Sequence, residues 1–281
     1  MPPAYDAVRV NRCQRRAHRC PPSAPPWEPV AQLHQPPVRP VSWQNSVPGT
    51  EGTAASTGKD RSVKQLDSPD HVPLSPAILY FGTPVALISS TNPDGGANLA
   101  PMSSVFWLGQ TAILGLGTRS QTSKNLRERP ECVINLPDTC CVTAVDRLAL
   151  TTGADPVPEG KAAVGYRHVP DKFGHAGLTA IASDLVGPPR VAQCPVALEG
   201  RVMAAHAVET SDPEEAGSVE VFEVRVLRVQ VYERIRMPGT ENRIDPDRWR
   251  PLVMSFQKFY GLGEQVLPSR LAAAIDEEWY R

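Results

Sequence analysis

From about residue 73 onward, short apolar runs alternate with clusters of turn-forming residues. Such runs, rich in valine, isoleucine and leucine, predict β-strands. We expect strands at residues 85–90, 98–107, 112–116, 132–136, 196–208 and 219–235. The tract TNPDGG after the first run predicts a tight turn, because proline presets one φ and the glycines accept positive φ. The first three strands have no room for crossover helices between them, so they should form an antiparallel meander.

Helical signals are fewer. Ser120 is a good N-cap for a helix at 121–129, and Pro130 should end that helix. A second short helix is expected at 142–150. From residue 247 the apolar positions recur with the spacing of an amphipathic helix: Trp249, Leu252, Val253, Phe256, Phe259 and Tyr260. A mainly β pattern with a few short helices predicts a closed or split β-barrel.

The first 72 residues differ from the rest in composition. Residues 1–50 hold 11 of the 30 prolines, and residues 51–70 are mostly glycine, serine, threonine and charged residues. Such a segment buries too little apolar surface to offset its ordering entropy, so we expect a disordered leader at 1–72. The leader's arginines could belong to a targeting peptide, an anion-binding arm or a solvated tail. Cys13, His18 and Cys20 lack a second ligand pair, so we expect no metal site there.

The remaining chain divides into a barrel domain at 73–238 and a C-terminal helical extension at 239–281. With 29 basic and 30 acidic residues, the chain offers no electrostatic reason to bind nucleic acid or an anionic membrane. No apolar run reaches the roughly 18 residues of a membrane helix. Six cysteines at irregular positions, without a secretory signal, favour reduced thiols and a cytoplasmic location.

Two polar loops carry the candidate chemistry. The sequence NLAPMSS at 98–104 can offer amide and hydroxyl groups to a heteroaromatic ring. The sequence TRSQTSKN at 118–125 opens the predicted helix, where unpaired N–H groups favour an anion, and Arg119 could add a charge-assisted bond. Together the loops suit a phosphorylated planar ligand, although a plain serine N-cap would also explain the second loop. The GLG at 115–117 lacks the third glycine and the βαβ unit of a dinucleotide-binding fold.

Five phrases occur in an informative order: YFGTPVALISS, NLAPMSS, TRSQTSKNL, ECVINLP and RWRPLVMSFQKFYGLG. They resemble the flavin reductase-like, FMN-binding split-barrel family, in its flavoredoxin branch, and the resemblance covers residues 73–263. It implies a Greek-key split β-barrel, a homodimer, and FMN bound near the subunit interface.

The resemblance also implies a set of binding residues. Those expected along the isoalloxazine and ribityl chain are Asn98, Ala100, Pro101, Met102, Ser103 and Ser104. Those expected at the phosphate are Arg119, Ser120, Thr122 and Asn125. The segment 166–175 should lie over the flavin and supply Lys172 and His175, unless it is an ordinary exposed loop. We expect neither a metal ion nor a catalytic side chain.

The implied activity is that of an NAD(P)H-dependent flavin reductase, in which hydride passes from nicotinamide C4 to flavin N5. FMN is the expected flavin, with FAD as the alternative. A flavoredoxin-like electron carrier with tightly bound FMN is the rival interpretation, and a binding scaffold without redox chemistry is a third. A flavin-dependent monooxygenase is a candidate partner. The apolar tail residues also favour a homodimer.

Overall fold

The computed structural model describes residues 71–208, 210–213 and 216–280. The predictions for the leader, including its arginines and its candidate metal ligands, concern residues outside these ranges. The described part of the chain begins at His71.

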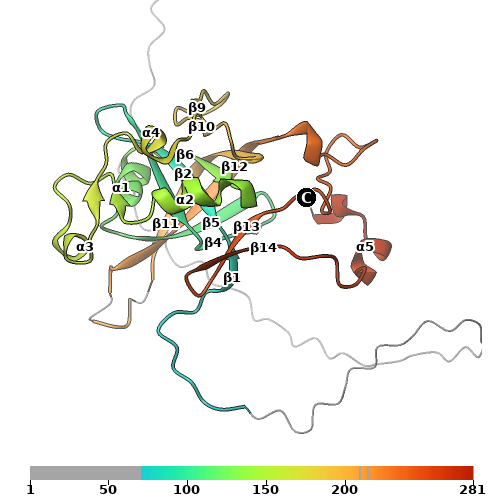
Figure 1. Cartoon of the computed structure of the whole chain (residues 1–281), viewed down its shortest axis with the longest axis horizontal. Helices are drawn as coiled ribbons and strands as arrows, with labels where there is room; N and C mark the ends of the chain where they lie inside the picture. The colour runs from blue at the N-terminus through green and yellow to red at the C-terminus, as the bar shows by residue number, and fades with distance from the viewer. Residues whose placement is uncertain (1–70, 209, 214–215, 281) are drawn as a thin grey trace, which may run out of the picture. The chain divides into compact units, whose positions relative to one another are not determined.

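The described chain consists mainly of antiparallel strands with a few short helices (Figure 1). Its strands are β1 (Phe81–Pro84), β2 (Ala86–Thr91), β3 (Ala97–Met102), β4 (Val105–Leu108), β5 (Thr111–Gly117), β6 (Glu131–Leu136), β7 (Thr151–Thr152), β8 (Arg167–His168), β9 (Ala180–Ile181), β10 (Arg190–Val191), β11 (Val196–Ala207), β12 (Val219–Val231), β13 (Leu252–Ser255) and β14 (Lys258–Gly261). Its α-helices are α1 (Gln121–Glu128), α2 (Val142–Arg147), α3 (Glu159–Ala163), α4 (Lys172–Ala176) and α5 (Arg270–Ala274), and its 3₁₀ helices are η1 (Thr139–Cys141), η2 (Glu233–Ile235) and η3 (Glu277–Tyr280).

Seven strands form the main sheet, in the order β3-β2-β6-β11-β12-β5-β4. Its two edge strands, β3 and β4, are consecutive in the chain and are joined only by Ser103 and Ser104. The sheet must therefore curl until its edges approach each other. The sequence predicted one strand at 98–107, which is wrong, because Ser103 and Ser104 interrupt it where the chain passes from one edge of the sheet to the other. We call this connection the seam. The backbone N–H of Gly115 donates to Ser104 O at 2.9 Å, and a Cβ at Gly115 would lie 3.3 Å from Ser104 Cβ, so this close approach favours glycine.

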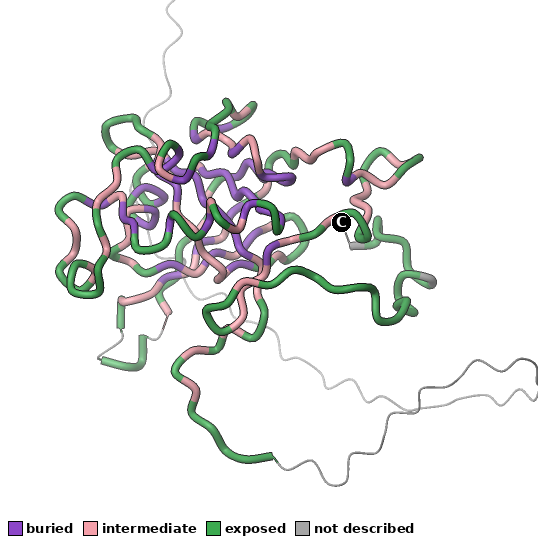
Figure 2. The backbone as a smooth tube through the Cα atoms, in the orientation of Figure 1, coloured by how far each residue is buried: buried purple, intermediate pink, exposed green. Residues whose placement is uncertain are grey.

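Strand β2 is buried on both faces. Ala86 and Ile88 point into a core cluster with Leu114, Ile134 and Phe222, whereas Leu87 points the opposite way. This alternation follows from the two-residue period of a strand. Figure 2 shows the buried positions concentrated along the central strands. The sheet thus has one face in the barrel core and another against covering helices.

The covering layer comes from α2 and α4. Val145, Leu148 and Phe173 form a second cluster, which packs against Leu87 and Leu99 of the β2–β3 hairpin. This cluster fixes both short helices beside β3. Because helices this short have little stability alone, the packing rather than helix propensity holds them in place.

Most predicted strands are confirmed, and so is the helix at 121–129 with its cap at Ser120. The predicted amphipathic helix after residue 247 is wrong. All of its apolar residues except Trp249 lie in the hairpin β13–β14 instead, and β13 pairs with β1. Pro251 would interrupt a helix because it lacks an N–H and disfavours helical backbone at the preceding residue. Phe256 and Gln257 adopt φ values of 44° and 64° and so make the tight turn.

Within the described ranges, no helix combines the length and apolarity needed to cross a bilayer.

Phe222 offers a test of the barrel core, since its side chain is fully buried. We expect Phe222→Ala to lower the free energy of unfolding by about 3–5 kcal/mol, because it leaves a cavity in a packed core. Urea denaturation monitored by circular dichroism measures this change. Leu227→Ala on the same strand removes a side chain that is 42% exposed, so it should lower the free energy of unfolding much less. Equal losses for both variants would contradict the proposed core.

Candidate functional site

Asn98 connects the edge strand β3 to the first turn of helix α1. Its Nδ2 donates to Thr122 Oγ1 at 3.0 Å and to Ser90 Oγ at 3.4 Å, and the side chain is 2% exposed. Its Oδ1 is buried and accepts no hydrogen bond from a described residue. A Cβ at Gly153 would lie 2.5 Å from this oxygen, so glycine is needed where the loop passes it. An unpaired buried acceptor is costly, which makes Oδ1 a candidate ligand contact.

Helix α1 begins at the same place. Ser120 caps the helix by accepting a hydrogen bond from the Ser123 N–H at 3.1 Å. The remaining N–H groups of a first helical turn lack intrahelical partners and favour an anion. Ser120, Gln121 and Thr122 line a cavity of about 160 Å³ together with Asn98. The two polar loops singled out in the sequence therefore share one concavity.

Two lysines line this cavity, and neither forms an ion pair with a carboxylate in the described part of the chain. Lys172, at the start of α4, is 3% exposed, and no described carboxylate pairs with it. Burial, followed by the positive charge of Lys161, lowers the pKa of Lys172 from 10.5 to about 8. Burial also lowers the pKa of Lys161, whose ammonium lies 5.2 Å from the centre of the Tyr166 ring. Two adjacent cations without an anion create a site where a phosphate would be strongly favoured.

The cavity continues into a larger groove of about 650 Å³, which is lined largely by apolar side chains. Met102, Leu116, Leu150 and Tyr166 line both spaces. The larger groove is also lined by Ser103, Ser104, Tyr80, Met254 and Phe259. Ser104 Oγ lies 3.3 Å from the Tyr80 hydroxyl. An apolar groove with hydroxyl groups at its edge suits a planar heteroaromatic ring.

The structure brings together nine of the twelve predicted site residues. Asn98, Ala100, Pro101, Met102, Ser120, Thr122 and Lys172 line the smaller cavity, while Ser103 and Ser104 line the adjoining groove. The other three lie elsewhere. Asn125 Nδ2 donates to Ser90 Oγ at 3.0 Å and to Asn92 Oδ1 at 2.9 Å, so it anchors α1 to the sheet. The His175 ring contacts the Arg147 carbonyl at 3.0 Å.

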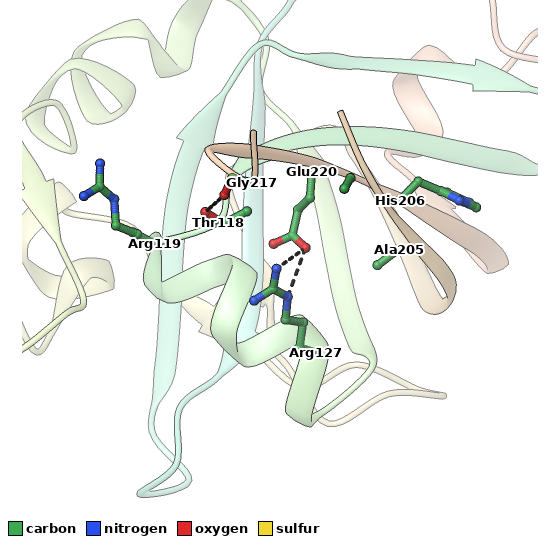
Figure 3. A pocket seen from close by; sticks show the side chains of 8 residues that line it. Thr118, Arg119, Arg127, Ala205, His206, Gly217 and Glu220 are labelled. Carbon is green, nitrogen blue, oxygen red and sulfur yellow. Dashed lines mark hydrogen bonds and ion pairs between the residues drawn. The ribbon is translucent and has the colours of Figure 1, made fainter. Parts of the chain in front are cut away.

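Arg119 is the third residue, and it lies on the outer side of the α1 start. It lines neighbouring surface grooves rather than the smaller cavity. Figure 3 shows its side chain directed away from the ion pair between Arg127 and Glu220, whose nitrogen and oxygen are 2.6 Å apart. The buried Glu220 carboxylate therefore engages Arg127 but leaves Arg119 for other contacts.

Sequence reasoning missed several lining residues. Lys161 and the segment at 148–153 line the cavity although neither belongs to a phrase with an evident ligand pattern. The small polar run Thr151–Thr152 followed by Gly153 was the available signal, because it resembles the loops already identified. In the described ranges, no three His, Cys, Asp or Glu side chains gather as metal ligands. Cys132, Cys140, Cys141 and Cys194 are free thiols.

Lys172 provides a pH test of the site. Its pKa is lower in the folded than in the unfolded chain, so the unfolded state holds more protons between about pH 8 and 10.5. The free energy of unfolding should therefore rise across that window by on the order of 2 kcal/mol from this group. Lys172→Met should remove this rise, as measured by urea denaturation at about pH 7.5 and pH 10. Lys124→Met, at an exposed position of α1, is the control. The same pH dependence in Lys172→Met and wild type would exclude a buried, charged Lys172.

Comparison with known proteins places this geometry in a family. The family model of the flavin reductase like domain matches residues 78–263. A Bacillus subtilis (strain 168) protein described as uncharacterized protein YdfE is 34% identical over 204 residues, which cover 73% of this chain and 95% of that protein.

Solved structures agree on the fold. Flavoredoxin of Desulfovibrio vulgaris (Miyazaki F) matches with a TM-score of 0.57 at 20% identity, over 72% of this chain and 99% of that chain. Nitrilotriacetate monooxygenase component B from Bacillus cereus matches with a TM-score of 0.54 at 22% identity, over 68% of this chain and 89% of that chain. The predicted mainly β, split-barrel fold is thus confirmed. This chain belongs to the flavin reductase-like family, as its sequence predicted.

Proposed function

We propose that this chain is an NAD(P)H-dependent flavin reductase whose cavity holds the FMN moiety of a flavin. One observation carries the proposal: a buried lysine that pairs with no described carboxylate lies beside the start of α1, in a cavity that opens into a groove lined by apolar and aromatic side chains. This combination fits a ligand that is anionic at one end and aromatic at the other. Membership of the flavin reductase-like family supports the same assignment.

The polar end would hold the phosphate. Ser120, Thr122 and the first-turn N–H groups of α1 would donate hydrogen bonds, and Lys161 and Lys172 would neutralise its charge. A phosphate there would also stabilise charged Lys172 and raise its pKa from the lowered value. Asn98 Oδ1 would then accept a hydrogen bond from a hydroxyl of the ribityl chain, which would satisfy an otherwise unpaired buried atom.

The apolar groove would hold the ring system. Pro101, Met102 and Tyr166 supply apolar surface, and Ser103 and Ser104 supply polar edges. When bound, the flavin supplies the redox chemistry, accepting hydride from nicotinamide at N5. The chain's own contribution is to position the ring and exclude water, so no side chain is required as a proton donor.

The test combines redox activity with a defined change at the phosphate end. Anaerobic mixing of protein, FMN and NADH or NADPH should bleach the flavin's visible absorbance. Lys172→Met should weaken FMN binding by at least about tenfold, because it removes a desolvated charge pair. Riboflavin lacks the phosphate, so its affinity should hardly change. Lys124→Met serves again as the matched control.

Each other outcome has a defined meaning. Tight FMN binding without bleaching by either nicotinamide would exclude the reductase and favour the electron carrier. Absence of FMN binding, together with no thermal stabilisation by saturating flavin, would favour the scaffold without redox chemistry. Equal weakening of FMN and riboflavin in Lys172→Met would place the phosphate elsewhere.

We also propose that the protein is a homodimer. The apolar tail residues, which supported this expectation beside the family resemblance, lie mainly in a hairpin instead of a helix, and apolar side chains are exposed on β1 and in and after this β13–β14 hairpin. They include Phe81, Phe256, Tyr260 and Leu262, with Phe81 at 72% exposure. An exposed apolar cluster of this kind is typical of an interface. A separate oxygenase could then consume the reduced flavin, since the Bacillus cereus neighbour is named as one component of a monooxygenase. A reducing cytoplasm would keep the free thiols reduced.

Light scattering coupled to gel filtration measures the oligomeric state. At micromolar concentration, the mass should be twice that of the 30.5 kDa chain. Tyr260→Glu, which places a charge in the exposed cluster, should shift the mass toward the monomer because it would bury an unpaired charge. Lys124→Glu should leave the dimer intact. A wild-type monomer under these conditions would exclude the proposed interface.

A further inference from the structure

A second groove adjoins the proposed phosphate cavity. Its volume is about 810 Å³, and its walls include Arg119, Ser120, Glu159 and Lys161. Ser120 and Lys161 line both spaces, so the groove continues outward from the phosphate end of the site. A Cβ at Gly160 would meet no atom within 4 Å, so this wall leaves open space.

The cationic groups form a series along this path. Lys172 lines only the inner cavity, Lys161 lines both spaces, and Arg119 lines only the outer groove. Neither Lys172 nor Arg119 has an ion pair with a described residue. The nearby Arg127 differs, because the buried carboxylate of Glu220 already neutralises it (Figure 3). Positive charge is thus distributed along the groove.

The position of these cations bears on whether FMN or FAD fits the site better, because the two flavins carry their negative charges differently. The phosphomonoester of FMN carries up to two negative charges on one phosphoryl group, with a second pKa of about 6. The pyrophosphate of FAD instead carries one negative charge on each of two neighbouring phosphoryl groups. Lys161 and Lys172 can neutralise the first phosphoryl group in the inner cavity. Arg119 lines the outer groove, into which the second phosphoryl group of FAD would extend. A carboxylate such as Glu159 is a suitable partner for the hydroxyl groups of a ribose.

We infer that the outer groove is an adenylate subsite, so that the protein prefers FAD to FMN, with Arg119 binding the second phosphoryl group. This inference rests on the proposed flavin site and specifies its ligand. It also reassigns Arg119, which the sequence placed at the phosphate of FMN. Arg119 becomes a specificity-determining residue for the dinucleotide, while Lys172 serves either flavin.

Calorimetric titration of the full chain with FMN, FAD and ADP tests the subsite. Wild type should bind FAD at least about tenfold more tightly than FMN. Arg119→Ala should abolish most of that preference while changing the FMN affinity by less than about threefold. Unchanged FMN affinity also shows that the variant is folded. Arg225→Ala, at an exposed position on β12 outside these grooves, should keep both affinities. Detectable ADP binding that Arg119→Ala removes would support the subsite further.

Three results would overturn the inference. Equal affinity of the wild type for FMN and FAD would show that the outer groove does not take the adenylate. If Arg119→Ala lowered the affinities for FMN and FAD by the same factor, Arg119 would bind the first phosphoryl group, as the sequence predicted. In both cases the proposed flavin reductase function would stand. Failure to bind either flavin would instead remove the flavin site and its extension together.

Discussion

The site depends on the hydrogen bonds that hold helix α1 against the β2–β3 hairpin. Asn98 reaches Thr122 from β3, and Asn125 reaches from α1 to Ser90 and Asn92. These amides are buried, so losing a partner would leave an unsatisfied polar group at a cost of about 1–3 kcal/mol. The network therefore fixes where the first helical turn lies relative to the sheet edge. That position determines the polar cavity, and the anion preference of the helix start determines its chemistry.

The same cavity contains a positive charge that no carboxylate of the described residues neutralises. Lys172 is buried beside Lys161, and its lowered pKa reflects the cost of keeping the ammonium charged there. In a folded chain with a free energy of unfolding of only about 5–15 kcal/mol, such a cost is substantial. An anion bound beside Lys172 would offset this cost, because an opposite charge favours the protonated ammonium. Stability and binding are thus coupled through one side chain.

The seam of the barrel supplies the second half of the site. Strands β3 and β4 are the sheet edges, and Ser103 and Ser104 carry the chain between them. Gly115 lets the backbone of β5 approach this connection closely. The hairpin β13–β14 pairs with β1, and its Met254 and Phe259 line the same groove. Because the two serines fall outside the strands, they line this groove instead of extending the ladder.

The sequence by itself determined the local structure: most strands, the capped helix α1, the turn chemistry and the family. These features depend on the apolar period and on residues such as Ser120, whose effect is confined to a few neighbours. Most of the site residues that it predicted do line the cavity or the adjoining groove, because nearly all of them lie in two contiguous loops. Only the tertiary structure decided that the tail is a hairpin, since the apolar spacing does not reveal that β1 offers an edge for pairing. It likewise directed Asn125, His175 and Arg119 away from the cavity and brought Lys161 in, because side-chain direction depends on packing between segments far apart in the chain.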